Sequence, residues 1–110
     1  MKRGEIYLLD LKDPVGSVQA GIRPVIVIQN DIGNLYSPTT IVSSVTTARK
    51  RWLPTHCIIG KGGGLKHNSI VLCEQLFTVN KTDLKQKIGT ITDKITLRRL
   101  NRCVRLSLGI

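Results

Sequence analysis

Short runs of apolar, mostly β-branched residues separated by turn-forming residues dominate the first 80 positions of the chain. Five such runs predict strands, because β-branched side chains suit a pleated, buried surface. Asn, Asp and Gly after the second run predict a turn over residues 30–34, and glycines predict a flexible hairpin loop over residues 60–64. The fifth run is long enough to be bent or bulged midway. The predicted strands are residues 4–11, 22–29, 39–47, 55–59 and 68–79.

Helical patterns come late in the chain. Residues 82–89 predict a helix with Thr82 as a possible N-cap and Gly89 as its stop. Residues 91–108 form a stronger pattern that Thr92 can cap, because apolar residues recur there at helical spacing opposite several arginines. Short strands followed by a terminal helix predict an antiparallel, barrel-like α+β domain. The apolar positions of the last helix are Leu97, Leu100, Cys103 and Val104.

Charge changes this picture more than overall composition does. Seventeen Lys and Arg stand against seven Asp and Glu, which gives a net charge of +10 in 110 residues. The excess is uneven, with four basic and four acidic residues in 1–48, five and one in 49–80, and eight and two in 81–110. Such a chain favours a polyanionic partner, either nucleic acid or an acidic protein segment, although a basic surface that serves only solubility is the alternative. The length predicts one domain, residues 1–110.

Several function classes lack their signatures in this sequence. The three cysteines include no C-x-x-C pair, and the two histidines lack the i, i+4 spacing of a helical metal pair. The Gly-rich stretch fits neither a Walker loop nor a dinucleotide-binding pattern. No apolar segment suits a signal peptide or a membrane span. We therefore expect a cytoplasmic protein with reduced thiols, no metal, no cofactor and no membrane contact.

Candidate chemistry lies at the ends of the predicted strands. Arg23 precedes Pro24, whose ring keeps the preceding residue extended, so the arginine is held where the second strand begins. If the second and third strands pair as a hairpin, Arg23 lies near Thr46 at one rim of the sheet. A guanidinium fork beside a hydroxyl is a plausible phosphate receptor. Glu74 and Gln75 interrupt the apolar run of the fifth strand.

The segments "KRGEIYLLDL", "GIRPVIVIQNDIGN", "YSPTTIVSSVT" and "LPTH" closely resemble the MazF/PemK (Kid) family of type II toxin–antitoxin endoribonucleases, and the similarity runs almost end to end. The resemblance implies a mainly β SH3-like barrel of antiparallel strands with a C-terminal helix, the MazF/CcdB-like plasmid-maintenance toxin fold, assembled as a homodimer. It also implies metal-independent, sequence-specific cleavage of single-stranded mRNA. Attack by the 2′-OH would leave a 2′,3′-cyclic phosphate and a 5′-OH, so no DNA cleavage is expected.

The same resemblance assigns roles to individual residues. Arg23 and Thr46 match the family's catalytic pair; the first would neutralise charge on the phosphorane, and the second would donate to a phosphate oxygen or orient the 2′-OH. Glu74 is only a possible auxiliary, because the Arg-x-Asp arrangement of one family branch is absent here. Trp52 would stack a base, or else pack at a dimer or antitoxin surface. The expected RNA-binding residues are Ser17, Gln19, Thr47, Trp52, Leu53 and Gln75.

Partners and competing functions follow from the same comparison. The expected partner besides RNA is an acidic, MazE-like antitoxin whose flexible tail covers the active groove. The basic last helix could bind this antitoxin, RNA phosphates or neither. Two other functions stay open from the sequence: a non-enzymatic toxin of the same fold that inhibits gyrase, and a plain RNA-binding barrel.

Overall fold

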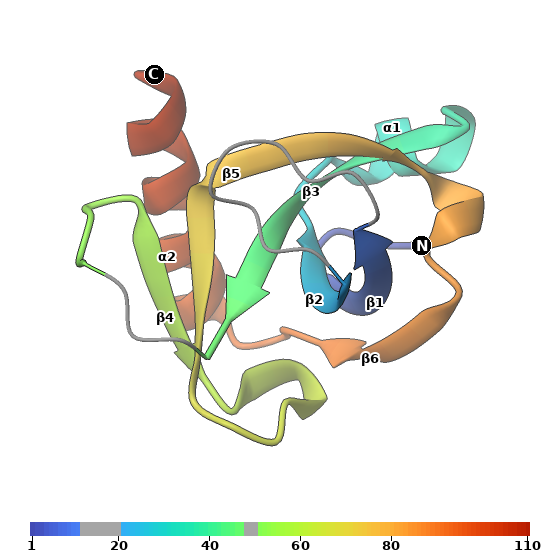
Figure 1. The fold of residues 1–110 in the computed structure, drawn as a ribbon. Helices are drawn as coiled ribbons and strands as arrows, with labels where there is room; N and C mark the ends of the chain where they lie inside the picture. Colours follow the sequence, from blue (N-terminus) through green and yellow to red (C-terminus); the bar gives the residue numbers. More distant parts are fainter. Residues whose placement is uncertain (12–20, 48–50) are drawn as a thin grey trace.

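A curled antiparallel sheet with one long helix beside it makes up the protein (Figure 1). The computed structural model describes residues 1–11, 21–47 and 51–110. The sheet has six strands in the order β4-β5-β3-β2-β1-β6, and it forms a half-barrel. The elements are β1 (Glu5–Leu11), β2 (Gly21–Val27), α1 (Asp31–Tyr36), β3 (Thr39–Thr46), β4 (His56–Gly60), η1 (Gly62–Gly64), β5 (Ser69–Asn80), η2 (Lys81–Asp83), β6 (Gln86–Thr90) and α2 (Lys94–Leu108).

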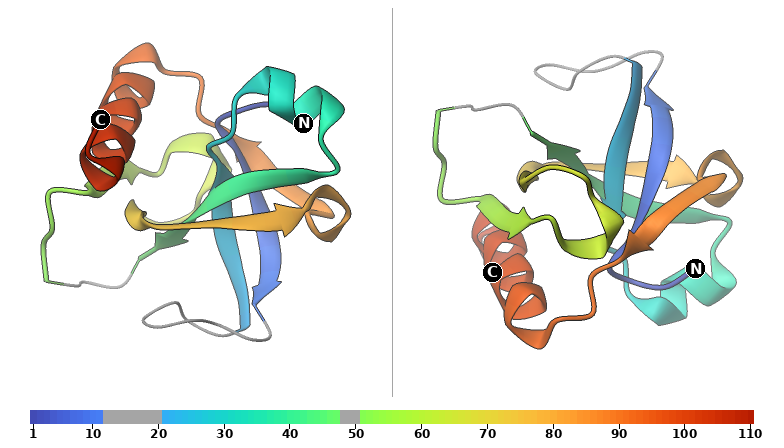
Figure 2. Two further views of the ribbon diagram at one scale, coloured as in Figure 1. Left: turned by 90° about the horizontal axis from the view of Figure 1, so that it is seen from above. Right: turned by 90° about the horizontal axis from the view of Figure 1, so that it is seen from below.

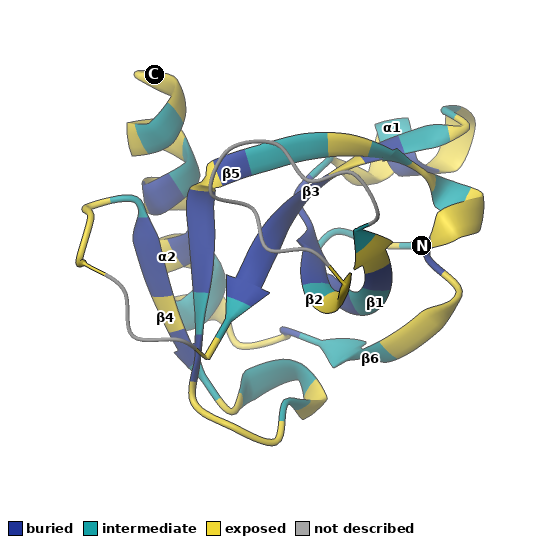
Figure 3. Cartoon of the chain, viewed as in Figure 1, coloured by how far each residue is buried: buried dark blue, intermediate teal, exposed yellow. Residues whose placement is uncertain are grey.

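The mainly β architecture with a terminal helix confirms the predicted fold class. Figure 2 shows α2 standing beside the sheet, where it contacts β4 and β5. Buried residues gather in β2, in β3 and in the first half of β5 (Figure 3). The central strands therefore carry much of the buried core.

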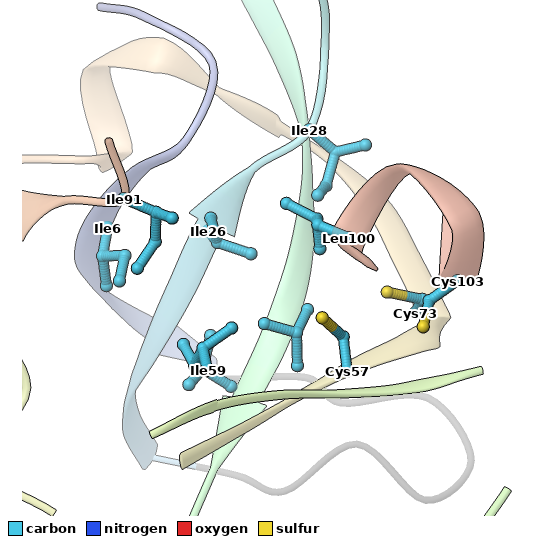
Figure 4. Packing of buried hydrophobic residues seen from close by; sticks show 11 residues of the cluster. Ile6, Ile26, Ile28, Cys57, Ile59, Cys73, Ile91, Leu100 and Cys103 are labelled. Atoms are coloured by element: carbon cyan, nitrogen blue, oxygen red, sulfur yellow. The ribbon is translucent and has the colours of Figure 1, made fainter. Parts of the chain in front are cut away.

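Strand β2 is buried on both faces, which explains its unbroken run of β-branched residues. Successive side chains of a strand point to opposite faces. Ile26 belongs to a core cluster shared with Leu100 of α2 (Figure 4), whereas Val25 and Val27 belong to a second cluster with Leu9 of β1. The apolar content of β2 thus serves two cores at once.

All five predicted strands are present, with boundaries that differ by one or two residues. The predicted irregularity of the fifth strand is also confirmed. Its pairing with β3 runs Ser43↔Leu76 and then Ser44↔Leu72, so three residues of β5 have no counterpart on β3. A bulge of this kind bends the strand and re-aims its side chains.

Two predictions of local structure are wrong. Residues 30–34 begin a short helix, α1, because the Asn30 side chain accepts a hydrogen bond from the Gly33 N–H at 2.8 Å and caps it. Asn34 then anchors this helix from a buried position, where it accepts from the Thr40 hydroxyl at 2.6 Å. Local turn propensity is thus overridden by a cap and a buried amide.

The predicted helix over residues 82–89 is a 3₁₀ turn followed by β6. This segment pairs with β1, where Ile6 faces Gly89, and Lys87 forms a 2.6 Å ion pair with Glu5. A Cβ on Gly89 would lie 2.1 Å from the carbonyl oxygen of Gly63, so the glycine serves close backbone packing. Pairing with a strand far away in the sequence decides the structure of this segment.

The terminal helix is confirmed, but it begins at Lys94 and its N-cap is Asp93, not Thr92. The Asp93 carboxylate accepts from the Thr96 N–H at 2.9 Å. Leu100 and Cys103 are buried, as the helical spacing predicted, and Gly109 ends the helix in the left-handed conformation, with φ of 72°.

Candidate active site

The antiparallel pairing of β2 with β3 brings Arg23 and Thr46 to one rim of the sheet. Val25 faces Ser44 and Ile26 faces Ser43, and two further residues of the same register place Arg23 opposite Thr46. Both side chains line one small hollow. The predicted hairpin pairing is therefore confirmed, and with it the proximity of these two residues. The lining residues are Leu11, Arg23, Ser44, Val45, Thr46, Leu72 and Gln75.

The lining of the hollow combines apolar residues with a cationic side chain and hydroxyl groups. Val45 and Leu72 are buried, whereas Arg23 is exposed and Thr46 is half-buried. None of the lining residues that the structure describes is acidic. A guanidinium group offers a planar fork of N–H donors, and a hydroxyl next to it adds one more donor. The arrangement suits an anion with several oxygens, such as a phosphodiester.

Ser44 is a lining residue that the sequence reasoning missed. Its side-chain oxygen is buried and has no hydrogen-bond partner among the described residues. The signal was available, because Ser44 and Thr46 are two residues apart on one strand and so point to the same face. Buried hydroxyls are almost always paired, so the unpaired Ser44 hydroxyl in this hollow indicates a position where a ligand atom can bind.

The bulge of β5 separates the two polar residues that interrupt its apolar run. Gln75 is buried and lines the hollow. Its neighbour Glu74 is not among the lining residues, and instead its carboxylate accepts hydrogen bonds from Thr55 and pairs with His56, both at 3.0 Å. The structure thus places the expected auxiliary away from the pair it was expected to assist.

The other expected RNA contacts lie outside the hollow. Thr47 is exposed directly after β3, and Trp52 and Leu53 expose 56% and 41% of their surfaces just before β4. Trp52 lines a second, more open groove between β4 and α2. Ser17 and Gln19 lie outside the described residues.

Other chemistries find little support at the described positions. Burial raises the pKa of Cys57 and of Cys73 to about 12, so neither thiol is a nucleophile at neutral pH. No group of three His, Cys, Asp or Glu within residues 1–11, 21–47 and 51–110 could hold a metal ion. Over the same residues, no helix has the length and apolarity needed to cross a membrane.

Solved structures similar to this chain include an antitoxin-bound endoribonuclease and a MazF protein. An endoribonuclease in complex with its cognate antitoxin from Mycobacterial species superposes with a TM-score of 0.83 at 24% identity, covering 100% of this chain and 96% of the other. MazF from Deinococcus radiodurans superposes with a TM-score of 0.80 at 17% identity, covering 100% and 97%. At this identity the likeness defines the fold, which is that of the MazF toxins.

Sequence similarity is closer and names the family. Residues 2–108 match the PemK-like, MazF-like toxin of type II toxin–antitoxin systems. The chain is 45% identical over 112 residues to Endoribonuclease MazF of Staphylococcus saprophyticus, covering 100% of this chain and 92% of the relative. It is 43% identical over 112 residues to Endoribonuclease EndoA of Bacillus subtilis, covering 100% and 96%. The protein belongs to the PemK-like, MazF-like toxin family.

Proposed function

We propose that this protein is a toxin that cleaves single-stranded mRNA at specific sequences without a metal ion. The observation that carries this proposal is the hollow in which Arg23 and Thr46 meet, on the fold of a family whose curated relatives are named endoribonucleases. A cationic fork beside a hydroxyl can hold a phosphodiester and stabilise charge that develops on it.

The reaction is a transfer of the phosphodiester to the neighbouring ribose oxygen. The 2′-oxygen attacks phosphorus and gives its proton to water, the bond from phosphorus to the 5′-oxygen breaks, and that oxygen takes up a proton from water. The products are a 2′,3′-cyclic phosphate and a 5′-OH, so DNA, which lacks the 2′-OH, is not a substrate.

Arg23 and Thr46 act as donors in this scheme. A guanidinium group stays protonated in proteins, so Arg23 binds the phosphorane oxygens and can direct a proton toward the leaving 5′-oxygen, but it does not remove the 2′-proton. Thr46 donates to a non-bridging oxygen or orients the 2′-OH. Removing one such donor typically lowers the rate by a factor of about 10² to 10³.

Base contacts come from the segments around the hollow. Gln75 contributes an amide to its lining. Thr47 is exposed directly after β3, and Trp52 and Leu53 are exposed just before β4. An exposed indole can stack an unpaired base, as single-strand RNA readers do. We include Ser17 and Gln19 in the RNA-binding set on the family resemblance alone.

The partners are an acidic antitoxin and a second copy of the chain, and we propose the cytoplasm as the compartment. A MazE–MazF complex from Deinococcus radiodurans has the same fold, with a TM-score of 0.75. The net charge of +10 favours an acidic partner. The second copy is proposed on the family resemblance. Light scattering at micromolar concentration should give the mass of a dimer, and a monomer would contradict this assembly.

The test is incubation of the purified protein with a long single-stranded RNA in EDTA, with mapping of the 5′ ends. We expect discrete cuts with 5′-OH ends, lost in Arg23→Ala and Thr46→Ala. Lys66→Ala, which removes an exposed lysine of the loop before β5, is the charge control and should cleave as the wild type does. Failure of the folded wild type to cleave a sequence-rich RNA would refute the proposal.

A further inference from the structure

A doubly closed turn precedes β4. The Leu53 carbonyl accepts from the His56 N–H at 3.0 Å, which closes a four-residue turn with Pro54 at its second position, where proline fits best. In the other direction, the Leu53 N–H donates to Nδ1 of His56 at 3.3 Å. The LPTH sequence thus builds a turn held by its backbone and by its histidine.

The second hydrogen bond defines the histidine tautomer. Because Nδ1 accepts, the neutral imidazole carries its proton on Nε2. That nitrogen lies 3.0 Å from Oε2 of Glu74, and the His56 side chain is only 2% exposed. The imidazole therefore bonds to the turn through Nδ1 and to Glu74 of β5 through Nε2. Moving the proton to Nδ1 would break the bond to the Leu53 N–H.

Both carboxylate oxygens of Glu74 bond to residues of the turn or directly after it. Oε2 pairs with His56, and Oε1 accepts from the Thr55 hydroxyl at 3.0 Å. A third link is backbone to backbone, because the Cys73 N–H donates to the Thr55 carbonyl at 3.2 Å. We call Thr55, His56 and Glu74 the turn clamp.

The charge state of Glu74 fits this role. Burial raises its pKa, but hydrogen bonds from its own backbone N–H, from His56 and from Thr55 outweigh burial, and the net pKa lies below the ordinary value. At neutral pH the carboxylate is ionised, which lets both oxygens accept. A carboxylate with both oxygens engaged by structural donors is poorly placed to take a proton from a substrate.

The turn clamp joins two parts of the candidate RNA site. On one side, the Trp52 and His56 rings form a T-shaped contact with centroids 5.5 Å apart and planes at 88°, and Leu53 belongs to the turn itself. On the other side, Glu74 is followed in the β5 bulge by Gln75, which lines the hollow. Two exposed base-contact candidates are thereby tied to the strand that supplies the buried one.

We propose that Glu74 and His56 are positioning residues that hold Trp52 and Leu53 at a fixed place relative to Gln75. RNA bases beside the scissile phosphate are then gripped in one register, whereas the chemical step belongs to Arg23 and Thr46. This inference rests on the proposed function for its kinetic part only.

Glu74→Gln is the sharpest perturbation, because it keeps the shape and removes one acceptor. If its amide nitrogen faces the Nε2–H of His56, a donor meets a donor, and if it faces Thr55, the hydroxyl must turn to accept from it, so in either case one contact of the turn clamp is lost or reversed. We expect KM for a short RNA that contains the cleavage site to rise about tenfold, as for a lost charged hydrogen bond, with kcat within about threefold of wild type. Asp83→Asn, an exposed carboxylate in η2, is the control and should leave both values unchanged.

Thr55→Val is a milder variant of the same size. It removes the hydroxyl that bonds to Oε1 but leaves His56 and the backbone link in place, so folding is preserved. We expect the same direction of change as in Glu74→Gln, with a smaller rise in KM.

Trp52 supplies a readout that does not depend on RNA cleavage, because it is the single tryptophan of the chain. The Trp52 emission reports on the T-shaped contact between the indole and the His56 ring. We expect the emission of the folded protein to change in Glu74→Gln and in Thr55→Val, and to stay constant in Asp83→Asn. Circular dichroism well below the melting temperature confirms that each variant is folded.

Two results would overturn the proposal. Loss of kcat in Glu74→Gln at unchanged KM would place Glu74 in the chemical step, and unchanged KM together with unchanged Trp52 emission would show that the turn clamp positions nothing. If the wild type cleaves no RNA, the proposed function fails by itself, and the emission of Glu74→Gln still decides whether the turn clamp holds Trp52.

Discussion

Adjacent serines on β3 have opposite hydrogen-bond environments, so alanine should lower stability at Ser43 but not at Ser44. Ser43 is fully buried, and its hydroxyl donates to the Leu72 carbonyl at 2.7 Å. Ser44 is also buried, but its hydroxyl has no partner among the described residues. The two side chains point to opposite faces of the same strand, so each position is the control for the other.

The magnitudes follow from what each alanine removes. Ser43→Ala deletes a short buried hydrogen bond and leaves a carbonyl with one acceptor site unused, which should lower the free energy of unfolding by about 1–2 kcal/mol. Ser44→Ala removes a hydroxyl whose burial without a partner costs about 1–3 kcal/mol, offset by lost packing, so stability should stay equal or rise by about 1 kcal/mol. The two variants should differ by about 2 kcal/mol.

Urea unfolding followed by circular dichroism measures this difference. With equal m-values of about 1–3 kcal/mol/M, the midpoint of Ser44→Ala should lie about 1 M above that of Ser43→Ala. A loss of stability in Ser44→Ala as large as in Ser43→Ala would refute the reasoning, because it would mean that the Ser44 hydroxyl is satisfied in solution.

Three further predictions concern the packing of the sheet and helix. Leu100→Ala should lower the free energy of unfolding by about 2–5 kcal/mol, since this fully buried side chain joins α2 to the core, and a loss below 1 kcal/mol in urea unfolding would contradict the assigned packing. Gly89→Ala should prevent β6 from packing on the Gly63 carbonyl and yield little folded protein, as judged by soluble expression; a wild-type melting temperature would contradict the close approach. Burial raises the pKa of Glu5, but hydrogen bonds, of which that from Lys87 is the strongest, leave this pKa below its ordinary value. The stabilisation that Glu5 contributes is therefore present above the unfolded pKa of about 4.3 and is lost as the pH falls through the folded pKa. Glu5→Gln should therefore flatten the acid limb of the stability curve, and an unchanged limb would contradict this assignment.

Much of the fold was predictable from local patterns, because strands made of β-branched residues and a helix with one apolar face carry strong periodic signals. The positions of Leu100 and Cys103 in the core follow directly from helical spacing. Residues 82–89 show where this reasoning ends. Their helical propensity is real, but pairing with β1 and burial of Leu84 favour a 3₁₀ turn and a strand.

The candidate site divides in the same way. The neighbourhood of Arg23 and Thr46 was predictable, since a hairpin of two adjacent strands has a register that simple counting can extend. The separation of Glu74 from Gln75 was not, because it depends on a bulge in β5 whose position is set by pairing with β3 and β4. A sequence run does not reveal which of two neighbouring polar residues faces a hollow and which faces another segment.

By itself, the sequence determined the strands, the terminal helix, the excess of positive charge and the arginine held before Pro24, since each of these depends on neighbouring residues and their covalent geometry. Only the tertiary structure decided that the Ser44 hydroxyl is buried without a partner among the described residues and that Glu74 bonds to the turn before β4. Both outcomes depend on segments that are distant in the chain and meet only in the folded sheet. Burial gives these contacts their energetic weight, because a polar group removed from water loses free energy of solvation unless it finds a partner within the fold.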